Sequence, residues 1–270
     1  MKLICLKWHS FTLFLTKYPN MIKITCPLTY IPLRREPGHR SEQVSQILFG
    51  ETAVVSEEFK DWYKVITDFD SYTGWLEKDS VRIPDAVEEN QKRQLIKEPF
   101  ICLRSDAERF ILCAGSEIQP PKEDGSVSIN HQRFIPETPF KTHTKTLIED
   151  AISFLHAPYL WGGRTLFGID CSGFIQTLFK IRNINLPRDA RDQALIGENV
   201  ESLHAVNSGD LVFFSQESDS ITHVGLYLGN GKIIHASKQV RIDRLDEKGI
   251  YNSALKKHTH QFECIKRIPS

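Results

Sequence analysis

The feature that most constrains this 270-residue chain is a cysteine between a turn-rich segment and an apolar helical run. Residues 158–170 combine a proline with several glycines, and apolar side chains then recur at spacings of three and four over residues 174–179. This spacing predicts a helix with Cys171 in its first turn. Unpaired backbone N–H groups and the positive end of the helix dipole favour a thiolate there. We therefore expect the pKa of Cys171 to lie below the ~8.5 of a free cysteine, which would make it a nucleophile.

Two histidines lie further along the chain on a predicted β-hairpin. Residues 222–236 are typical of two strands joined by a Gly-Asn-Gly turn, with His223 on the first strand and His235 on the second. One histidine can take a thiol proton while the other fixes its tautomer and orientation. We predict Cys171 as nucleophile, His223 as general base and His235 as the orienting residue. The backbone N–H of Cys171 is the expected oxyanion donor.

The register of this hairpin decides whether the two histidines can cooperate. A three-residue loop at 229–231 pairs Leu228 with Lys232 and puts both imidazoles on one face. A two-residue loop at 230–231 shifts the pairing by one residue and sends them to opposite faces. We predict the three-residue loop.

Four short motifs follow one another in the C-terminal half. They are Asp-Cys-Ser-Gly-Phe at 170–174, Gly-Asp-Leu-Val-Phe-Phe at 209–214, His-Val-Gly-Leu-Tyr-Leu-Gly at 223–229 and Ile-His-Ala at 234–236. In this order they resemble the NlpC-type cell-wall cysteine peptidases, a compact papain-like family, over about residues 141–268. The resemblance implies a papain-like catalytic domain at residues 141–270.

The N-terminal half is expected to fold separately. Residues 25–86 show short strand patterns and turns, and Asp-Trp-Tyr-Lys-Val followed by Tyr-Thr-Gly-Trp resembles a bacterial SH3-like barrel. Residues 87–140 begin with a charged linker and continue with weaker strand patterns, which we interpret as a second, degenerate SH3-like barrel. Residues 1–24 form an N-terminal extension with no assigned fold. The predicted fold class is α+β, a papain-like NlpC-type catalytic domain preceded by two small SH3-like β-barrels.

The resemblance also implies which side chains bind substrate. In relatives with an N-terminal SH3-like domain, the residues matching Asp170 and Ser172 bind the free amine of the peptide's first L-alanine. An ordinary helix cap is the alternative role for Asp170. Tyr159 matches a tyrosine whose hydroxyl lines the oxyanion site, and Arg188 and Asp189 match a pair that lines the pocket.

Two residues of the first barrel complete the implied site. Glu51 and Tyr72 look like the barrel residues that close one end of the cleft in those relatives. Such a wall admits only a free N-terminus, because a longer peptide would collide with it. An amine buried there without a carboxylate partner would be costly.

These expectations predict a cysteine peptidase acting on peptidoglycan-derived peptides. It would hydrolyse the bond between γ-D-glutamate and L-lysine or meso-diaminopimelate, release L-Ala-γ-D-Glu, and need no metal or other cofactor. Three alternatives stay open. The Cys-His-His set could ligate zinc, the chain could be a non-catalytic cell-wall-binding module, or it could be an amidase or acyltransferase on the same fold.

Charge and cysteine usage limit the other classes. The chain has 34 basic and 34 acidic residues and a formal net charge of zero, so it lacks the electrostatic footprint of a protein that binds nucleic acid or an anionic membrane. Its 6 cysteines show no CxxC pair and no zinc-ribbon spacing, which favours free thiols. We expect a monomer.

The first twenty residues bear on localisation. Lys7 and His9 interrupt the apolar residues 3–15, and no small-residue cleavage site follows. The stretch is also too short to span a bilayer. Because Met21 offers a second start, we expect a cytoplasmic protein without a membrane span. The alternative is a periplasmic or secreted protein, if residues 1–20 are a degenerate signal peptide.

Overall fold

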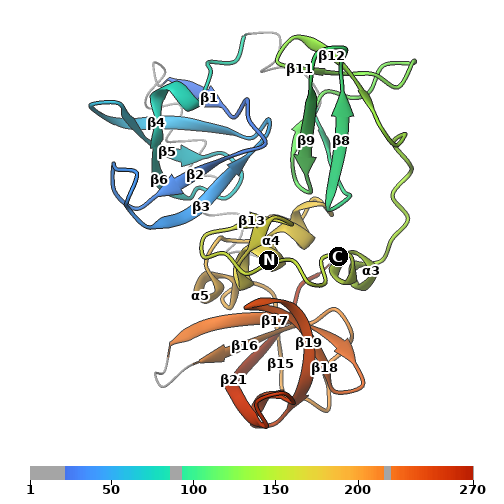
Figure 1. The fold of residues 1–270 in the computed structure, drawn as a ribbon. Coiled ribbons are helices and arrows are strands. Elements are labelled where there is room, and N and C mark those ends of the chain that lie inside the picture. The colour runs from blue at the N-terminus through green and yellow to red at the C-terminus, as the bar shows by residue number, and fades with distance from the viewer. Residues whose placement is uncertain (1–21, 86–92, 216–219, 270) are drawn as a thin grey trace.

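The computed structural model describes residues 22–85, 93–215 and 220–269. The predictions for residues 1–20 and for the linker around residues 86–92 therefore lie outside the described part. Figure 1 shows three regions: two small β-structures side by side and, beneath them, a larger region in which a layer of helices covers a curved sheet.

The first region is a six-stranded antiparallel sheet in the order β1-β4-β5-β6-β2-β3. Its strands are β1 Lys23–Thr25, β2 Tyr30–Arg34, β3 Gln43–Leu48, β4 Thr52–Phe59, β5 Trp62–Thr67 and β6 Thr73–Glu77, followed by a 3₁₀ turn at Lys78–Ser80. Apolar residues from different strands, among them Ile24, Leu33 and Val65, are fully buried in one core. The sheet begins at Lys23, two residues before the expected start of the barrel.

The second region consists of short antiparallel strands in two sheets, with orders β11-β12-β8-β9 and β10-β7. The strands are β7 Gln94–Leu95, β8 Phe100–Arg104, β9 Arg109–Cys113, β10 Glu117–Ile118, β11 Val127–Ile129 and β12 Gln132–Pro136. Its core contains Leu103, Leu112 and Phe134, and also Phe49 from the first region. The two regions therefore share buried apolar surface.

The third region packs helices against a seven-stranded sheet in the order β15-β21-β16-β17-β18-β19-β20. An additional pairing of β20 with β21 closes six of these strands into a barrel. The elements are α3 Leu147–Ile152, β13 Arg164–Thr165, β14 Gly168–Ile169, α4 Cys171–Lys180, α5 Ala190–Gln193, β15 Glu198–Val200, β16 Leu211–Ser215, β17 Ile221–Gly229, β18 Lys232–Ser237, β19 Gln239–Asp246, β20 Gly249–Asn252 and β21 Lys257–Arg267.

Alternation along the strands assigns each side chain of this sheet to one of two cores. On β16, Leu211 and Phe213 pack toward the helices, whereas Val212 and Phe214 pack inside the barrel. This is the period of two that strand geometry imposes. His223 pairs directly with Phe214 and so lies on the barrel-interior face.

The loop between β17 and β18 differs from the prediction. Gly229 pairs with Lys232, so the loop is the two residues Asn230 and Gly231, and the expected pairing of Leu228 with Lys232 is wrong. Leu228 forms a bulge, and Tyr227 then pairs with Ile233. The bulge adds the one residue that the shorter loop removes, so the two histidines still share a face.

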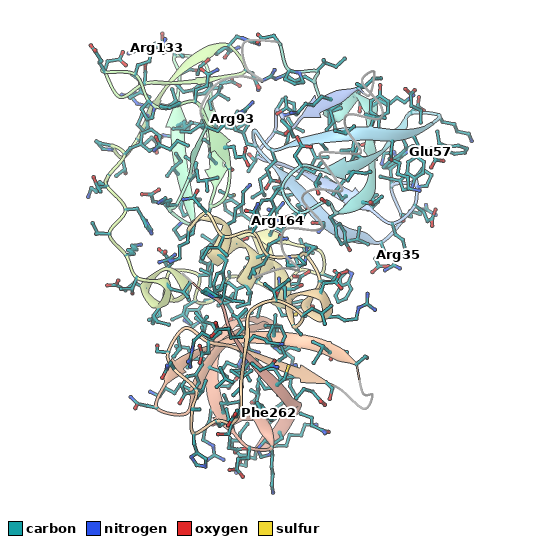
Figure 2. The ribbon with its side chains drawn as sticks, turned by 180° about the vertical axis from the view of Figure 1, so that it is seen from behind. Arg35, Glu57, Arg93, Arg133, Arg164 and Phe262 are labelled. Atoms are coloured by element: carbon teal, nitrogen blue, oxygen red, sulfur yellow. The ribbon has the colours of Figure 1, made fainter. Side chains whose placement is uncertain are left out.

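Buried ion pairs join all three regions. Glu51, in the turn between β3 and β4, accepts hydrogen bonds from Arg164 Nη1 and Nη2 at 2.9 and 2.8 Å and from Lys180 Nζ at 2.5 Å. Lys180 also contacts Glu117 of β10 at 3.0 Å. Figure 2 shows Arg164 where the helix layer meets the two β-structures. The helix that begins with Cys171 therefore ends at this junction.

Candidate active site

Cys171 occupies the first turn of α4, as its sequence context predicts. Asp170 is the N-cap and accepts a hydrogen bond from the backbone N–H of Gly173 at 2.7 Å. A side chain at Gly173 would place its Cβ 2.2 Å from the carbonyl oxygen of Gly163, so only glycine fits where the helix meets that loop. Cys171 itself is 6% exposed.

The acidity of Cys171 differs from the prediction. Burial, followed by the charge of Asp170, raises the pKa of the thiol to about 12. Backbone hydrogen bonds from Val224 and Ser172 favour the thiolate, but they do not outweigh this cost. The cysteine is therefore a neutral thiol at rest and needs a base to become a nucleophile.

His223, His235 and Asp243 form a continuous hydrogen-bonded relay. Asp243 was not predicted from the sequence. His223 Nε2 lies 2.8 Å from His235 Nδ1, and His235 Nε2 lies 3.0 Å from Asp243 Oδ2. Because a carboxylate only accepts, His235 donates from Nε2 and accepts at Nδ1, so His223 donates from Nε2. This assignment leaves the Nδ1 lone pair of His223 free to take a proton.

The surroundings keep this base neutral. Burial, followed by the neighbouring His235 and His260, holds the pKa of His223 well below its usual value. The His260 ring stacks on His223 with centroids 4.1 Å apart, and burial lowers its own pKa to about 4. A neutral imidazole is the form that accepts a thiol proton.

Asp243 anchors the far end of the relay as a charged group. Burial alone would raise its pKa, but hydrogen bonds from His235 and Arg241 hold it below the usual value. Asp243 is two residues from Arg241, which pairs with His235 across β18 and β19, so all three side chains share a face. The alternation of Arg241 and Asp243 on β19 was the feature of the sequence that could have indicated a polar partner for His235.

A cavity of about 760 Å³ opens over Cys171 and His223. Most of the predicted site residues line it, namely Tyr72, Tyr159, Asp170, Cys171, Ser172, Arg188, Asp189 and His223. Burial, followed by Cys171 and Asp170, raises the pKa of Tyr159, so its hydroxyl keeps its proton. His235 lies behind His223 and does not line the cavity.

Arg188 organises the floor of this cavity. It forms two hydrogen bonds to Asp170, at 3.0 and 2.6 Å, and one to Ser172 Oγ at 2.9 Å. Asp170 Oδ2 also accepts from the backbone N–H of Gly162 at 2.8 Å. With the cap to α4, each Asp170 oxygen accepts two N–H donors, which uses its acceptor capacity.

One end of the cavity is built partly by the first β-structure. The Tyr72 hydroxyl donates to Asp189 Oδ1 at 3.4 Å, and Glu42 accepts from the Trp161 indole at 2.7 Å and from Arg35 at 2.6 Å. Glu42 and Trp161 were not predicted, because only the packing of two distant segments brings them to the cavity. We call this end, lined by Glu42, Tyr72, Trp161 and Asp189, the barrel end.

The assignment of Glu51 to the cleft is wrong. Glu51 is 2% exposed, does not line the cavity, and pairs with Arg164 and Lys180 instead. Burial would raise its pKa, but these two cations lower it to about 2. Its position in a Gly-Glu turn resembled a wall residue, whereas Glu42 is the first-region glutamate that lines the cavity.

The zinc alternative does not fit the arrangement of the donors. Among the residues that the structure describes, no three His, Cys, Asp or Glu side chains are placed to hold one metal ion. The His223 and His235 nitrogens that face each other share a hydrogen bond.

No helix within the described ranges is long and apolar enough to cross a membrane.

The fold and the site define a class. A thiol at a helix start, with a histidine relay on a neighbouring barrel, is the arrangement of a papain-like cysteine peptidase. Residues 156–261 match the model of the NlpC/P60 family, and residues 33–81 match that of the bacterial dipeptidyl-peptidase SH3 domain. The chain belongs to the NlpC/P60 family.

Individual relatives extend over most of the chain. It is 34% identical over 214 residues to the gamma-D-glutamyl-L-lysine dipeptidyl-peptidase of Bacillus subtilis, which is 72% of each chain. It is 28% identical over 251 residues to dipeptidyl-peptidase 6 of Lysinibacillus sphaericus, covering 80% of this chain and 89% of that one. The crystal structure of an NlpC/P60 family protein from Bacillus cereus superposes with a TM-score of 0.77 at 21% identity, over 91% of this chain and 99% of the other. The predicted papain-like fold with an N-terminal SH3-like domain is confirmed, as is the cysteine-peptidase class.

Proposed function

We propose that this enzyme hydrolyses the bond between γ-D-glutamate and a diamino acid in peptidoglycan-derived peptides, releasing L-Ala-γ-D-Glu. The barrel end of the cavity carries the proposal, because the carboxylates of Glu42 and Asp189 line it beside Tyr72 and Trp161 and can pair with a free N-terminal amine. Two relatives bear the name gamma-D-glutamyl-L-lysine dipeptidyl-peptidase, which supports this substrate class.

The relay supplies the proton transfers. His223 Nδ1 takes the thiol proton as the Cys171 sulfur attacks the γ-carbonyl carbon, so a high resting pKa of the thiol does not prevent reaction. The resulting imidazolium is stabilised through His235 by the Asp243 carboxylate. The backbone N–H of Cys171 and the Tyr159 hydroxyl bind the oxyanion.

Collapse of the tetrahedral intermediate breaks the C–N bond. His223 donates its proton to the leaving amine, and a thioester to Cys171 remains. Water, deprotonated by His223, then attacks the thioester carbonyl, and the thiol regains its proton as L-Ala-γ-D-Glu leaves.

Glu42 and Asp189 bind the ammonium group of the substrate. Both carboxylates line the barrel end and retain acceptor capacity, unlike Asp170, which is engaged by Arg188 and by backbone N–H groups. Hydrogen bonds from Arg35 and Trp161 lower the pKa of Glu42 and keep it charged. In this scheme Asp170 orients Arg188 and caps α4, rather than binding the amine.

Product analysis on defined peptides tests the proposal. The enzyme is incubated with free-amine and N-acetylated forms of an L-Ala-γ-D-Glu-diamino acid tripeptide, and the products are identified by mass spectrometry. The free peptide should yield L-Ala-γ-D-Glu, and acetylation should cost most of the turnover. Equal turnover of both peptides would exclude the exopeptidase mode. An N-acetylmuramoyl tripeptide is included as a third substrate, and cleavage of its N-acetylmuramoyl–L-alanine bond would identify an amidase.

We also propose that the protein acts in the cytoplasm as a monomer. The cysteines that the structure describes, Cys26, Cys102, Cys113, Cys171 and Cys264, are all free, as is typical of a reducing compartment. Fractionation of cells expressing the full chain, and light scattering of the purified protein, test these two points. Recovery in the periplasm or medium, or the mass of a dimer, would contradict them.

A further inference from the structure

A second cavity adjoins the catalytic one on the side away from the first β-structure. It measures about 1080 Å³ and lies between the β19–β20 hairpin and β21. Ser237, Lys238 and His260 line both cavities, so the two are continuous next to His223. Phe262, which also lines it, lies low in the barrel on the far side of the helix layer from Arg35 (Figure 2). We call this second cavity the basin.

The basin carries an excess of uncompensated positive charge, although the whole chain is neutral. Lys238, Lys248 and Lys257 line it and are exposed. Within the described residues, none of these ammonium groups forms an ion pair with a carboxylate. Arg241 is held by Asp243, and Glu247 is the one acidic side chain among the described lining residues.

Lys238 stands where the two cavities meet, and its backbone is fixed. It adopts a φ of 61° in the turn between β18 and β19, and its carbonyl accepts the backbone N–H of Tyr159 at 2.9 Å. The backbone of this lysine is therefore anchored beside Tyr159, the residue that we assign to the oxyanion site.

The position of the basin sets which half of the substrate meets it. If the N-terminus of the peptide is bound at the barrel end, as proposed above, the chain crosses Cys171 and its leaving half emerges on the other side. Here Ser237, Lys238 and His260 connect the cleft to the basin.

Resting on that proposed function, we propose that the basin binds the carboxylates of the leaving group and makes the enzyme selective for meso-diaminopimelate over L-lysine. The distal end of meso-diaminopimelate carries a carboxylate that the lysine cations attract, whereas the side chain of L-lysine ends in an ammonium group alone, which they repel. This preference differs from the L-lysine in the names of the two relatives.

Two matched tripeptides test the inference with the full-length enzyme. The values of kcat/KM are measured for L-Ala-γ-D-Glu-meso-diaminopimelate and L-Ala-γ-D-Glu-L-Lys at low salt. We expect a ratio of at least about fivefold in favour of meso-diaminopimelate. The ratio should shrink as ionic strength rises, because salt screens exposed charges over ~10 Å at 0.1 M.

Variants locate the origin of the preference. The double variant Lys248→Gln/Lys257→Gln should bring the ratio to within about twofold of unity, mainly by slowing the meso-diaminopimelate peptide. Lys232→Gln is the matched control, because Lys232 is an exposed lysine of the same barrel that lines neither cavity. It should keep the wild-type ratio.

The outcomes separate the inference from the function on which it rests. Cleavage of both peptides at equal rates, or a preference that the double variant retains, overturns the inference and leaves the proposed function standing. Cleavage of neither peptide overturns both.

Discussion

The relay of Cys171, His223, His235 and Asp243 contrasts with the junction where Glu51, Arg164 and Lys180 meet. The relay lies within one region, on a helix start and three consecutive strands, and its spacing follows from strand register. The junction combines side chains from all three regions, because Lys180 also contacts Glu117 of β10, and Glu51 and Lys180 are separated by 129 positions in the sequence. Local periodicity fixes the relay, whereas the docking of separate folding units fixes the junction.

The two regions also use charge differently. The relay keeps the thiol and the catalytic imidazole neutral and confines its negative charge to Asp243. The junction buries full charges, which is tolerable only while every partner remains in place. Substitutions in the relay should therefore remove activity and leave the fold intact, whereas substitutions in the junction should remove stability first.

The largest effect should follow Cys171→Ala. Loss of the nucleophile should lower kcat by about 10⁴-fold or more, with little change in the thermal unfolding temperature. Release of L-Ala-γ-D-Glu, followed by chromatography, measures this loss. Cys264→Ala removes another thiol of the same region and should retain activity. If the Cys171 variant were as active as the wild type, the relay would have no chemical role, and its contrast with the junction would not hold.

Asp243→Asn should come next, with kcat reduced by about 100- to 1000-fold and KM nearly unchanged. The amide cannot supply the negative charge that stabilises the His223 imidazolium through His235. Asp246→Asn is the control, since Asp246 lies on the same strand and contacts His258 at 2.8 Å outside the relay. Equal losses in the two variants would show that the strand matters and the relay does not.

Glu51→Gln tests the junction. Loss of this carboxylate leaves Arg164 uncompensated and Lys180 with Glu117 alone, so the free energy of unfolding should fall by about 3 kcal/mol. Urea denaturation followed by circular dichroism measures the change. Glu117→Gln should cost much less, because the Glu117 side chain is 24% exposed, whereas Glu51 is buried and pairs with both Arg164 and Lys180. A Glu51 variant of normal stability but low activity would place the junction in the catalytic machinery after all.

The smallest effect should come from Glu42→Gln, which sharpens the comparison between two glutamates of one β-structure. The kcat/KM for the free-amine peptide should fall about tenfold, and stability should be unchanged because Glu42 lies at the surface of the cavity. Turnover of the N-acetylated peptide should stay as low as in the wild type. Glu57→Gln, at the outer edge of the same β-structure (Figure 2), is the control. Identical behaviour of both variants would remove Glu42 from the substrate site.

The sequence predicted the parts of the site that a single pattern determines. The apolar period after Cys171 located the helix, and alternation along β17 and β18 put the two histidines on one face. The loop was predicted one residue too long, because a bulge at Leu228 has no clear signature in the sequence. The helix start does favour the thiolate of Cys171, as predicted, but burial has the larger effect and raises the pKa of the thiol.

Residues whose role depends on packing could not be assigned in this way. Glu42 and Glu51 both belong to the first β-structure, and no local feature says which of them faces the cleft. That choice follows from the docking of distant segments, which one sequence does not specify. Asp243 lies near His235 through the register of β18 and β19, but the sequence does not show which polar residue of β19 makes the contact.

The helix α4 has a further consequence for any attempt to shorten this enzyme. Its 10 residues begin with the nucleophile and end with Lys180, so a helix ~15 Å long connects Cys171 to the junction of Glu51, Arg164 and Lys180. A fragment limited to residues 141–270 would lack the carboxylates of Glu51 and Glu117, which pair with Arg164 and Lys180, and would leave these two cations without those partners. We therefore expect the catalytic domain without the two β-structures to lose activity, because the helix that carries the nucleophile would lose its partners in both.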